Sequence, residues 1–196
     1  MFASHPDLFQ ASAIPGLSLR EDFVTPAEER TLIAAIEGIE LSPFRFQGWV
    51  GKRLTASFGW RYDFEDSSFR PTEPIPGFLL PLRARAADLA GLSPDDLVQV
   101  LLIRYDPGAG IGWHRDRPVF DHVIGISLGE EAPLRFRRRR EKGFERVNVP
   151  LAPRSAYHLT GEVRHEWEHS IAPLPVRRWS VTFRSLSEKG RKVAQA

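Results

Sequence analysis

Residues 178–184 have the sequence Arg-Trp-Ser-Val-Thr-Phe-Arg, in which polar and apolar side chains alternate without a break. Successive side chains of a β-strand point to opposite faces, so this alternation predicts a strand with one buried apolar face. The other face carries Ser180 and Thr182 between two arginines, Arg178 and Arg184. This face is either a solvated surface or an anion-binding surface, because the planar guanidinium group holds carboxylates through two parallel hydrogen bonds.

Most of the chain after residue 96 shows the same period of two, and two earlier segments share it. Turns rich in glycine, proline and acidic residues separate these segments, and Lys142-Gly143 is typical of a hairpin tip. The predicted strands are Phe44–Val50, Phe58–Phe64, Leu97–Tyr105, His122–Leu128, Leu134–Arg139, Phe144–Val149, Ser155–Leu159, Val163–Ile171 and Trp179–Leu186. They indicate a mainly β fold of the α+β class, a double-sheet barrel or jelly roll with helices packed outside.

Two helices are expected in the first half of the chain. Thr25-Pro26-Ala27-Glu28 has the capping-box pattern with proline at the first helical position, so a helix is predicted from about residue 26 to 39. A second helix is predicted from about residue 76 to 90, where apolar residues recur at helical spacing. Gly91 ends this helix, and Pro81 marks a restart or a kink within it.

The composition limits the class of protein. A chain of 196 residues with 42% hydrophobic and 27% charged residues is long enough to bury the core of one globular domain. It has no cysteine, so a bound metal needs His, Asp or Glu ligands. No apolar run reaches the roughly 20 residues that span a bilayer, and residues 1–10 lack the basic stretch of a secretion signal. We therefore expect a cytoplasmic monomer with no membrane partner.

Charge is distributed unevenly along the chain. Residues 1–100 hold 9 Lys and Arg against 14 Asp and Glu, a net charge of −5, whereas residues 101–196 hold 18 against 11, a net charge of +7. The densest basic run is Arg135-Phe136-Arg137-Arg138-Arg139-Arg140. Two interpretations have equal weight: a solvated hairpin that resists edge-to-edge pairing, or a rim that contacts the phosphates of a nucleic acid.

A candidate metal-binding motif, His114-Arg115-Asp116, follows a glycine-rich turn at residues 105–110. In an extended backbone the first and third of these side chains point the same way, so the imidazole and the carboxylate can approach one ion. With a second histidine they would form the two-His, one-carboxylate triad of non-haem iron(II) oxygenases. The motif alone is weak, because a His–Asp hydrogen bond explains such a pair more often than a metal does.

The second histidine is expected in the string His165-Glu166-Trp167-Glu168-His169. This string also matches the H-E-x-x-H motif of zinc proteases, which needs a helix. Apolar and polar residues alternate here as in a strand, which argues against the zinc-protease interpretation. A strand places His165 and His169 on the same face, so spacing does not choose between them. His122 and His158 are further candidates, although each is more typical of a packed or hydrogen-bonded strand residue.

Together these motifs resemble those of the AlkB-like family of iron(II)- and 2-oxoglutarate-dependent dioxygenases. The resemblance covers roughly residues 97–186, and the order and spacing of the motifs are specific. The matching stretches are Tyr105-x-Pro107-Gly108, His114-x-Asp116, Trp167-Glu168-His169-Ser170-Ile171 and Arg178-x-Ser180-x-Thr182-Phe183-Arg184. The resemblance implies a single domain with a double-stranded β-helix: helices and a β-hairpin substrate lid at about 1–96, a catalytic β-core at about 97–187 and a tail at 188–196. The lid would include residues 52–54 and 58–62.

The resemblance also implies a role for each matching residue. His114, Asp116 and His169 would be the catalytic iron ligands, and His165 would be a neighbour. The residues implied to bind 2-oxoglutarate are Tyr105, Arg178, Ser180 and Arg184. Fe(II), 2-oxoglutarate and O2 are then the expected cofactors, and oxidation of an N-methyl group would release formaldehyde and the free amine.

Two departures from the family leave the substrate open. Ile103 stands where founding members have an Asn that bonds the co-substrate, and Pro118 stands where some members carry an acid that touches the flipped base. Trp60 and Tyr62 are candidates for stacking on an extruded base unless they are simply core, and Arg146 is a further candidate contact. The first hypothesis is an oxidative demethylase of alkylated DNA or RNA, acting in repair or modification. The alternatives are a protein or small-molecule hydroxylase or demethylase on the same scaffold, and a non-catalytic nucleic-acid-binding module.

Overall fold

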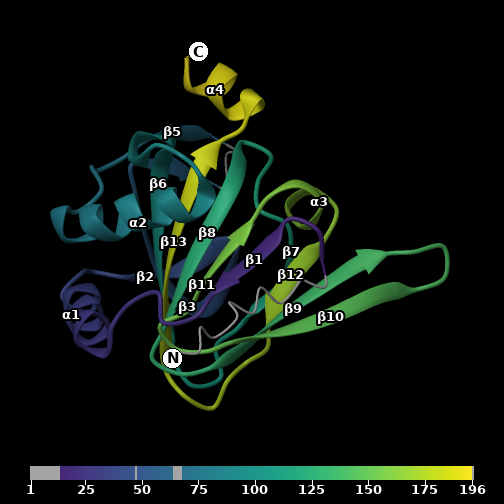
Figure 1. Cartoon of the computed structure of the whole chain (residues 1–196), viewed down its shortest axis with the longest axis horizontal. Helices are drawn as coiled ribbons and strands as arrows, with labels where there is room; N and C mark the ends of the chain where they lie inside the picture. Colours follow the sequence, from purple (N-terminus) through teal and green to yellow (C-terminus); the bar gives the residue numbers. More distant parts are fainter. Residues whose placement is uncertain (1–13, 47, 64–67, 196) are drawn as a thin grey trace, which may run out of the picture.

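Two antiparallel β-sheets form the centre of the molecule and face each other (Figure 1). The computed structural model describes residues 14–46, 48–63 and 68–195. The larger sheet consists, in spatial order, of β1 Leu17–Arg20, β11 Ala156–Leu159, β8 Phe120–Leu128, β13 Arg178–Leu186, β6 Leu97–Tyr105, β3 Trp49–Phe58 and β2 Ser42–Phe46. The smaller sheet consists of β10 Phe144–Leu151, β9 Ala132–Arg139, β12 Glu168–Ile171 and β7 Ile111–His114. Strands β4 Trp60–Tyr62 and β5 Phe69–Pro71 form a separate pair. The expected mainly β, double-stranded β-helix architecture is confirmed.

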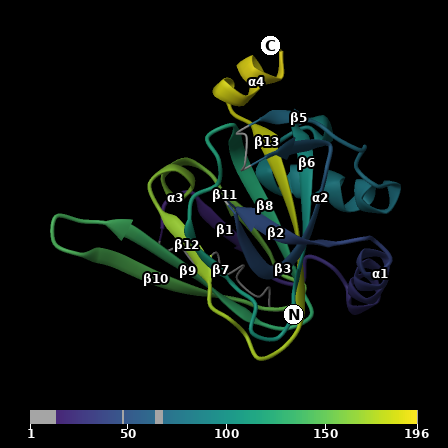
Figure 2. The same cartoon turned by 180° about the vertical axis from the view of Figure 1, so that it is seen from behind.

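Helices α1 (Pro26–Glu37) and α2 (Leu80–Ala90) cover the outer face of the larger sheet, as Figures 1 and 2 show from opposite sides. The shorter elements are the 3-10 helices η1 Gly77–Leu79 and η2 Pro94–Asp96, and the helices α3 Gly161–His165 and α4 Glu188–Ala194. Helix α4 lies within the expected C-terminal tail. No helix in the described ranges is long and apolar enough to cross a bilayer.

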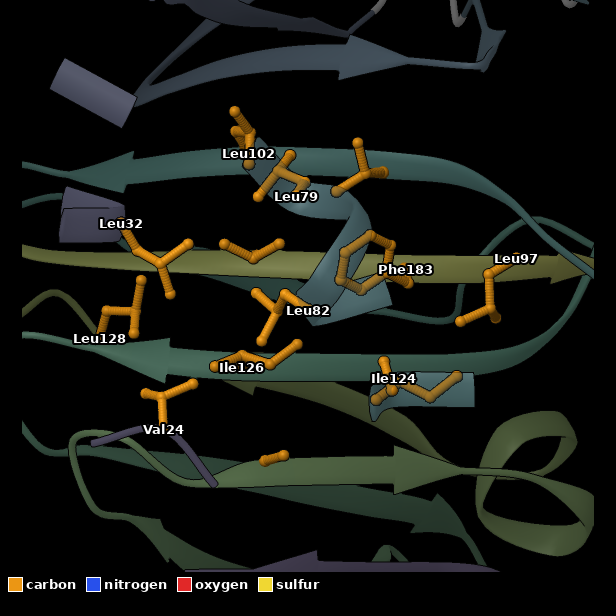
Figure 3. Close-up of a cluster of buried hydrophobic side chains, with 14 of the residues drawn as sticks. Val24, Leu32, Leu79, Leu82, Leu97, Leu102, Ile124, Ile126, Leu128 and Phe183 are labelled. Atoms are coloured by element: carbon orange, nitrogen blue, oxygen red, sulfur yellow. The ribbon is translucent and has the colours of Figure 1, made fainter. Parts of the chain in front are cut away.

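A hydrophobic core fills the space between the helices and the larger sheet. In Figure 3 the side chains of Leu79 and Leu82 lie over Phe183 and its neighbours on the sheet. All three are fully buried or nearly so, and each large apolar side chain buried in this way contributes about 1.5–3 kcal/mol. A second core lies between the two sheets, where Ile103 of the larger sheet and Phe136 of the smaller sheet belong to one cluster. Val181 and Phe183 of β13 pack into the first core. The polar face of β13 therefore points the other way, toward the space between the sheets.

Helix α1 begins where it was predicted and ends two residues earlier, whereas the predicted second helix consists of η1 followed by α2, which begins four residues later than expected. Thr25 caps α1: its hydroxyl accepts from the Glu28 amide at 3.2 Å, and the Glu28 carboxylate accepts from the Thr25 amide at 2.7 Å. Pro81 lies in the first turn of α2, directly after η1, so it marks the expected restart. Gly91 ends α2 in the left-handed conformation at φ 66°.

The predicted strand Val163–Ile171 is wrong in its first half. Residues 161–165 form helix α3, and only Glu168–Ile171 form strand β12. Helix α3 has only five residues, less than two turns, so it is too short to leave a helical periodicity in the sequence. The zinc-protease motif still fails, because α3 ends at its first histidine, His165.

Some predicted strands combine parts of two strands, and others were missed. The predicted segment Phe44–Val50 includes the end of β2 and the start of β3, and Phe58–Phe64 includes the end of β3 and all of β4, with Phe64 outside the described residues. Strands β1, β5 and β7 and most of β3 were not predicted. Residues 52–54, expected in the lid, lie in β3 of the larger sheet, and the remaining lid candidate is the β4–β5 pair.

Candidate active site

Three side chains with metal-binding groups converge beside the smaller sheet. His114 is the last residue of β7, and His169 lies opposite it in the adjacent strand β12. Their ring centroids are 4.3 Å apart. Asp116 follows two residues after His114, and one ligand atom from each of the three side chains lies within 4.8 Å of the others. Pairing of β7 with β12 therefore assembles the three residues that the sequence motifs indicated.

Both histidines present a neutral imidazole to this cluster. Nδ1 of His114 donates a hydrogen bond to the Gly112 carbonyl at 2.8 Å, so Nε2 carries the free lone pair. Burial lowers the pKa of His114, although the nearby Asp116 opposes this. Burial, and then repulsion from a proton on the nearby His114 ring, lower the pKa of His169 to about 3. At pH 7 both rings are neutral, which is the form that binds a metal.

The carboxylate of Asp116 has one bonded oxygen and one free oxygen. Nε and Nη2 of Arg184 each lie 2.7 Å from Oδ1. Oδ2 is buried with no hydrogen-bond partner among the described residues, 3.6 Å from Nε2 of His169. Burial raises the pKa of Asp116, but the charge of Arg184, followed by the electrostatic effect of the neighbouring His169, outweighs burial and holds the pKa far below its usual range. Asp116 is therefore ionised, with one oxygen available to a cation.

This donor set fits iron(II). Two neutral imidazoles and one carboxylate are the protein ligands of non-haem iron(II) oxygenases, which keep other coordination positions open. A buried carboxylate oxygen without a partner is costly, and a cation between the three ligand atoms would remove that cost. The alternative interpretation of His-x-Asp as a simple hydrogen-bonded pair does not account for the free Oδ2.

A cavity of about 850 Å³ opens beside the three side chains. The residues proposed from the sequence that line it are Tyr62, Tyr105, His114, Asp116, His169, Arg178, Ser180 and Arg184. The polar face of residues 178–184 thus points into the cavity and is not a solvated outer surface. The opposite face packs into the helix-side core through Val181 and Phe183, as the alternation predicted.

Arg178 supplies an anion-binding group at the cavity wall. Its side chain is 1% exposed, and its guanidinium lies 4.9 Å from the ring centroid of Tyr105. Nη2 donates to Oγ of Ser127 at 2.9 Å, whereas Nε and Nη1 are buried without a partner among the described residues. Burial lowers the pKa of Arg178, and neighbouring Tyr105 opposes this. A buried cation with two unsatisfied donors suits a carboxylate ligand.

Arg184 has a different environment from Arg178. Besides its two contacts with Asp116, it donates from Nη1 to Oε1 of Gln99 at 3.0 Å. These bonds make Arg184 a positioning residue for the metal-binding carboxylate. Its contact with a carboxylate of 2-oxoglutarate stays a prediction, as do the contacts of Tyr105 and Ser180.

The three candidate substrate contacts lie in different places. Tyr62 lines the cavity, and the guanidinium of Arg117 lies 4.6 Å from its ring centroid. Trp60 stacks on Phe69 with centroids 4.8 Å apart and is not among the residues that line the cavity. Arg146 lies on the exposed side of β10, also outside the cavity lining. Their roles as substrate contacts stay predictions.

Two polar residues in the cavity wall, Arg53 and Gln99, were not among the predicted site residues, although Arg53 lies in the segment 52–54 that was expected in the lid. Arg53 is 7% exposed, and its guanidinium lies 3.7 Å from the ring centroid of Phe44, with no ion-pair or hydrogen-bond partner in the described part of the chain. Gln99 is also buried and links Arg184 to Oγ of Ser57. The sequence carried no motif for either residue, because their positions depend on the pairing of β3 with β6.

The other histidines lie away from the metal-binding cluster. His165 is half exposed at the end of α3, with Nε2 3.5 Å from Oδ1 of Asp121. His122 and His158 share a hydrogen bond of 2.8 Å between Nδ1 and Nε2, and their rings stack. This confirms the interpretation of His122 and His158 as packed, hydrogen-bonded residues. The structure therefore selects His169 over His165 by position.

Comparisons with known proteins agree with this geometry. Residues 16–184 match the family model described as the 2OG-Fe(II) oxygenase superfamily. The chain is 30% identical over 172 residues to tRNA (carboxymethyluridine(34)-5-O)-methyltransferase alkbh8 of Xenopus tropicalis, covering 85% of this chain and 27% of that protein. It is 30% identical over 185 residues to the alkylated DNA repair protein ALKBH8 homolog of Arabidopsis thaliana, covering 81% of this chain and 51% of that protein. The chain thus spans about a quarter to a half of the length of these relatives.

The fold also matches a solved structure, that of OsALKBH1. The two chains superpose with a TM-score of 0.68 at 16% sequence identity, covering 88% of this chain and 97% of the other. At this identity the match concerns the arrangement of the sheets and helices, which is the arrangement described above.

Proposed function

The chain belongs to the 2OG-Fe(II) oxygenase superfamily as an AlkB-like member, and we propose that this dioxygenase demethylates alkylated nucleic acid by oxidation. One observation carries the proposal: His114, Asp116 and His169 converge on one point beside a large cavity, and an ionised oxygen of Asp116 has no partner there. In the proposal these three side chains hold Fe(II), and Arg178 binds a carboxylate of 2-oxoglutarate.

When bound, iron and 2-oxoglutarate supply the oxidation: O2 converts 2-oxoglutarate to succinate and CO2 and hydroxylates a C–H bond of the substrate. The chain's own residues bind and orient the reactants. Arg184 keeps Asp116 ionised and fixes one of its oxygens, so that the other points to the metal position. Burial keeps His114 and His169 neutral, so that no proton competes with the metal at pH 7.

In the proposal, residues of the cavity wall bind the co-substrate and the substrate. The two free donors of Arg178 can bind a carboxylate in a bidentate manner, with Tyr105 and Ser180 beside them. Tyr62 lines the same cavity, and its ring can stack on a base that is flipped out of the nucleic-acid strand. An N-methyl group hydroxylated there would lose formaldehyde and leave the free amine, with the N–C bond broken and the proton returned to nitrogen.

A nucleic-acid substrate is supported by two independent points. Two relatives have names that refer to a modified tRNA or to alkylated DNA. The second half of the chain, which forms the catalytic core, has a net charge of +7. We further propose a role in nucleic-acid repair or modification, with residues 1–196 acting as one monomeric domain; size-exclusion chromatography with light scattering checks the monomer.

The test is a substrate panel with Fe(II), 2-oxoglutarate and O2. Single-stranded DNA and RNA with N-methylated bases, a methylated peptide and a free methylated nucleoside are compared for formaldehyde and succinate release. We expect coupled release on the oligonucleotides and none from the His169→Ala variant. Release only from the peptide would overturn the nucleic-acid part of the proposal. Unchanged succinate production by His169→Ala would overturn the assignment of the iron site.

A further inference from the structure

The outer face of the smaller sheet carries a group of arginines and aromatic rings that the reaction does not use. Side chains that are cross-strand partners, or two residues apart on one strand, point to the same face. Arg139 pairs with Phe144 and Arg137 pairs with Arg146, while Leu134 and Phe136 of β9 point to the inter-sheet core. We call this outer group the arginine face: Trp113, Arg135, Arg137, Arg139, Phe144 and Arg146.

Two aromatic rings hold the guanidinium groups of the arginine face. Arg135 and Arg137 lie 5.1 and 4.6 Å from the ring centroid of Trp113. Arg137, Arg139 and Arg146 lie 4.5, 5.2 and 5.4 Å from the ring centroid of Phe144. A guanidinium placed over a ring keeps the N–H groups at its edge available to an anion while the ring restricts its orientation.

Positive charge on the arginine face is only partly neutralised. Arg137 pairs with Glu168 at 2.5 Å, but Arg135 donates to the neutral hydroxyl of Ser170. Arg139 and Arg146 are exposed, and neither has a carboxylate partner in the described part of the chain. Four arginines thus face one carboxylate.

The remaining arginines of the basic run behave differently. Arg138 forms ion pairs with Glu145, Glu162 and Glu166, and Arg140 also pairs with Glu145. The charges of Arg138 and Arg140 are thus paired with the protein's own carboxylates, whereas the arginine face remains open to a partner.

The arginine face is continuous with the cavity. Trp113 is adjacent to His114 in β7, lines the cavity and contacts Arg135 and Arg137. From there β9 and β10 extend away from the body of the molecule (Figure 1). A chain whose modified unit enters the cavity can therefore continue over this face.

We propose that the arginine face binds the phosphate backbone of a single-stranded nucleic acid next to the nucleotide that enters the cavity. Alternate residues on a strand are about 7 Å apart, so neighbouring arginines can reach successive phosphates of an extended strand. A single strand fits because its bases need not be unpaired before one enters the cavity. This inference rests on the proposed function and adds where the substrate strand lies.

The test of the proposed backbone contact measures the affinity of the full chain for single-stranded oligonucleotides. The probes are unmodified, fluorescently labelled RNA and DNA of 15 nucleotides, and the affinity is measured at several salt concentrations. The test variant is Arg139→Ala/Arg146→Ala, which removes two charges from the arginine face. The matched control is Arg140→Ala/Lys142→Ala, which removes two charges from the same hairpin outside the defined face. A thermal melt of each variant confirms that it is folded.

We expect the wild-type affinity to fall with salt, and the slope of log K against log salt to decrease in magnitude by about 1.4 in the test variant. The control should keep the wild-type slope. Equal slopes for the two variants would overturn the proposal, because the arginine face would then contribute no more than the rest of the hairpin. A poly-glutamate peptide that binds the wild type as tightly as either oligonucleotide would also overturn it, because the face would then not distinguish a nucleic acid from an acidic peptide. Salt-dependent binding through this face without release of formaldehyde from any panel substrate would instead contradict the proposed function and leave the binding surface established.

Discussion

The two oxygens of Asp116 have different partners, and this asymmetry is what the proposed iron site requires. Arg184 binds one oxygen and so fixes the direction of the other. Loss of a residue that orients a metal ligand commonly weakens metal affinity 10- to 100-fold. Arg184 should therefore affect metal binding without being a ligand.

The variant Arg184→Met should bind Mn(II), used as a redox-stable substitute for iron, about 10- to 100-fold more weakly than the wild type. Isothermal titration measures this without turnover. Arg177→Met is the control, because Arg177 is an exposed arginine directly before β13 that pairs with Asp106 outside the metal-ligand cluster. Wild-type Mn(II) affinity in Arg184→Met would show that Asp116 does not need this partner.

Arg178 should instead determine the affinity for 2-oxoglutarate. Removing one partner of a buried charged pair costs about 2–5 kcal/mol, so Arg178→Met should raise the KM for 2-oxoglutarate at least about 30-fold. Mn(II) affinity should not change. The ligand-free variant should be at least as stable as the wild type, because a buried guanidinium with two unsatisfied donors is removed. An unchanged KM would place the co-substrate elsewhere in the cavity.

His158 gives the protein an acid-sensitive position. Burial, and then His122, lower the pKa of His158 to about 4, against about 6.5 in an unfolded chain. The folded state therefore binds fewer protons in this range, and stability is lost as pH falls from about 6.5 to 4. In His158→Gln, urea unfolding should show a weaker loss of stability over this window than in the wild type. Parallel pH profiles for the two proteins would contradict this assignment.

The residues that sequence reasoning found and missed differ in a physical way. His114 and Asp116 were indicated by their local spacing, whereas His169 was assigned only through the family resemblance, because period two left it equivalent to His165. Arg53 enters the cavity only because β3 pairs with β6, and this register depends on contacts between residues far apart in the chain. Such positions cannot be deduced from local spacing.

At the scale of single elements, helix α1 was predicted well because its start is encoded locally. Thr25 and Glu28 bond each other's backbone amides, so four consecutive residues determine the N-terminus. Helix α3 was missed because five residues are too few to show the 3.6-residue period that distinguishes a helix from a strand. Strand β7 was missed because it has only four residues and follows a turn rich in glycine.

The capping box should contribute measurably to the stability of the whole chain. Thr25→Ala removes the hydroxyl that accepts from the Glu28 amide, and loss of such a cap costs about 1 kcal/mol in the free energy of unfolding. Thr31→Ala on the same helix is the matched control, because its hydroxyl only bonds the Ala27 carbonyl, which is a helix-interior bond. We expect the control within about 0.5 kcal/mol of the wild type in urea unfolding. Equal losses would show that the cap has no special role.

At the scale of the whole molecule, the two cores have separate tasks. The helix-side core packs against the outer face of the larger sheet, and the inter-sheet core shares Ile103, Leu134 and Ile171 with the wall of the cavity. The proposed metal ligands lie on the smaller sheet and the loop after it, whereas Arg178 lies on the larger sheet. A metal with a chelating co-substrate would therefore connect the two sheets.

Ligand binding should then stabilise the folded chain as a unit. A ligand at 100 times its Kd adds about 2.7 kcal/mol to the free energy of unfolding, which raises the Tm of a chain of this size by roughly 5–10 °C. Mn(II) with 2-oxoglutarate should produce such a shift in the wild type, and a chelator should reverse it. Arg178→Met should keep the shift caused by Mn(II) alone and lose the further increase caused by 2-oxoglutarate, whereas His169→Ala should lose both. If 2-oxoglutarate raised the Tm of Arg178→Met as much as that of the wild type, the link between the sheets would not pass through this residue.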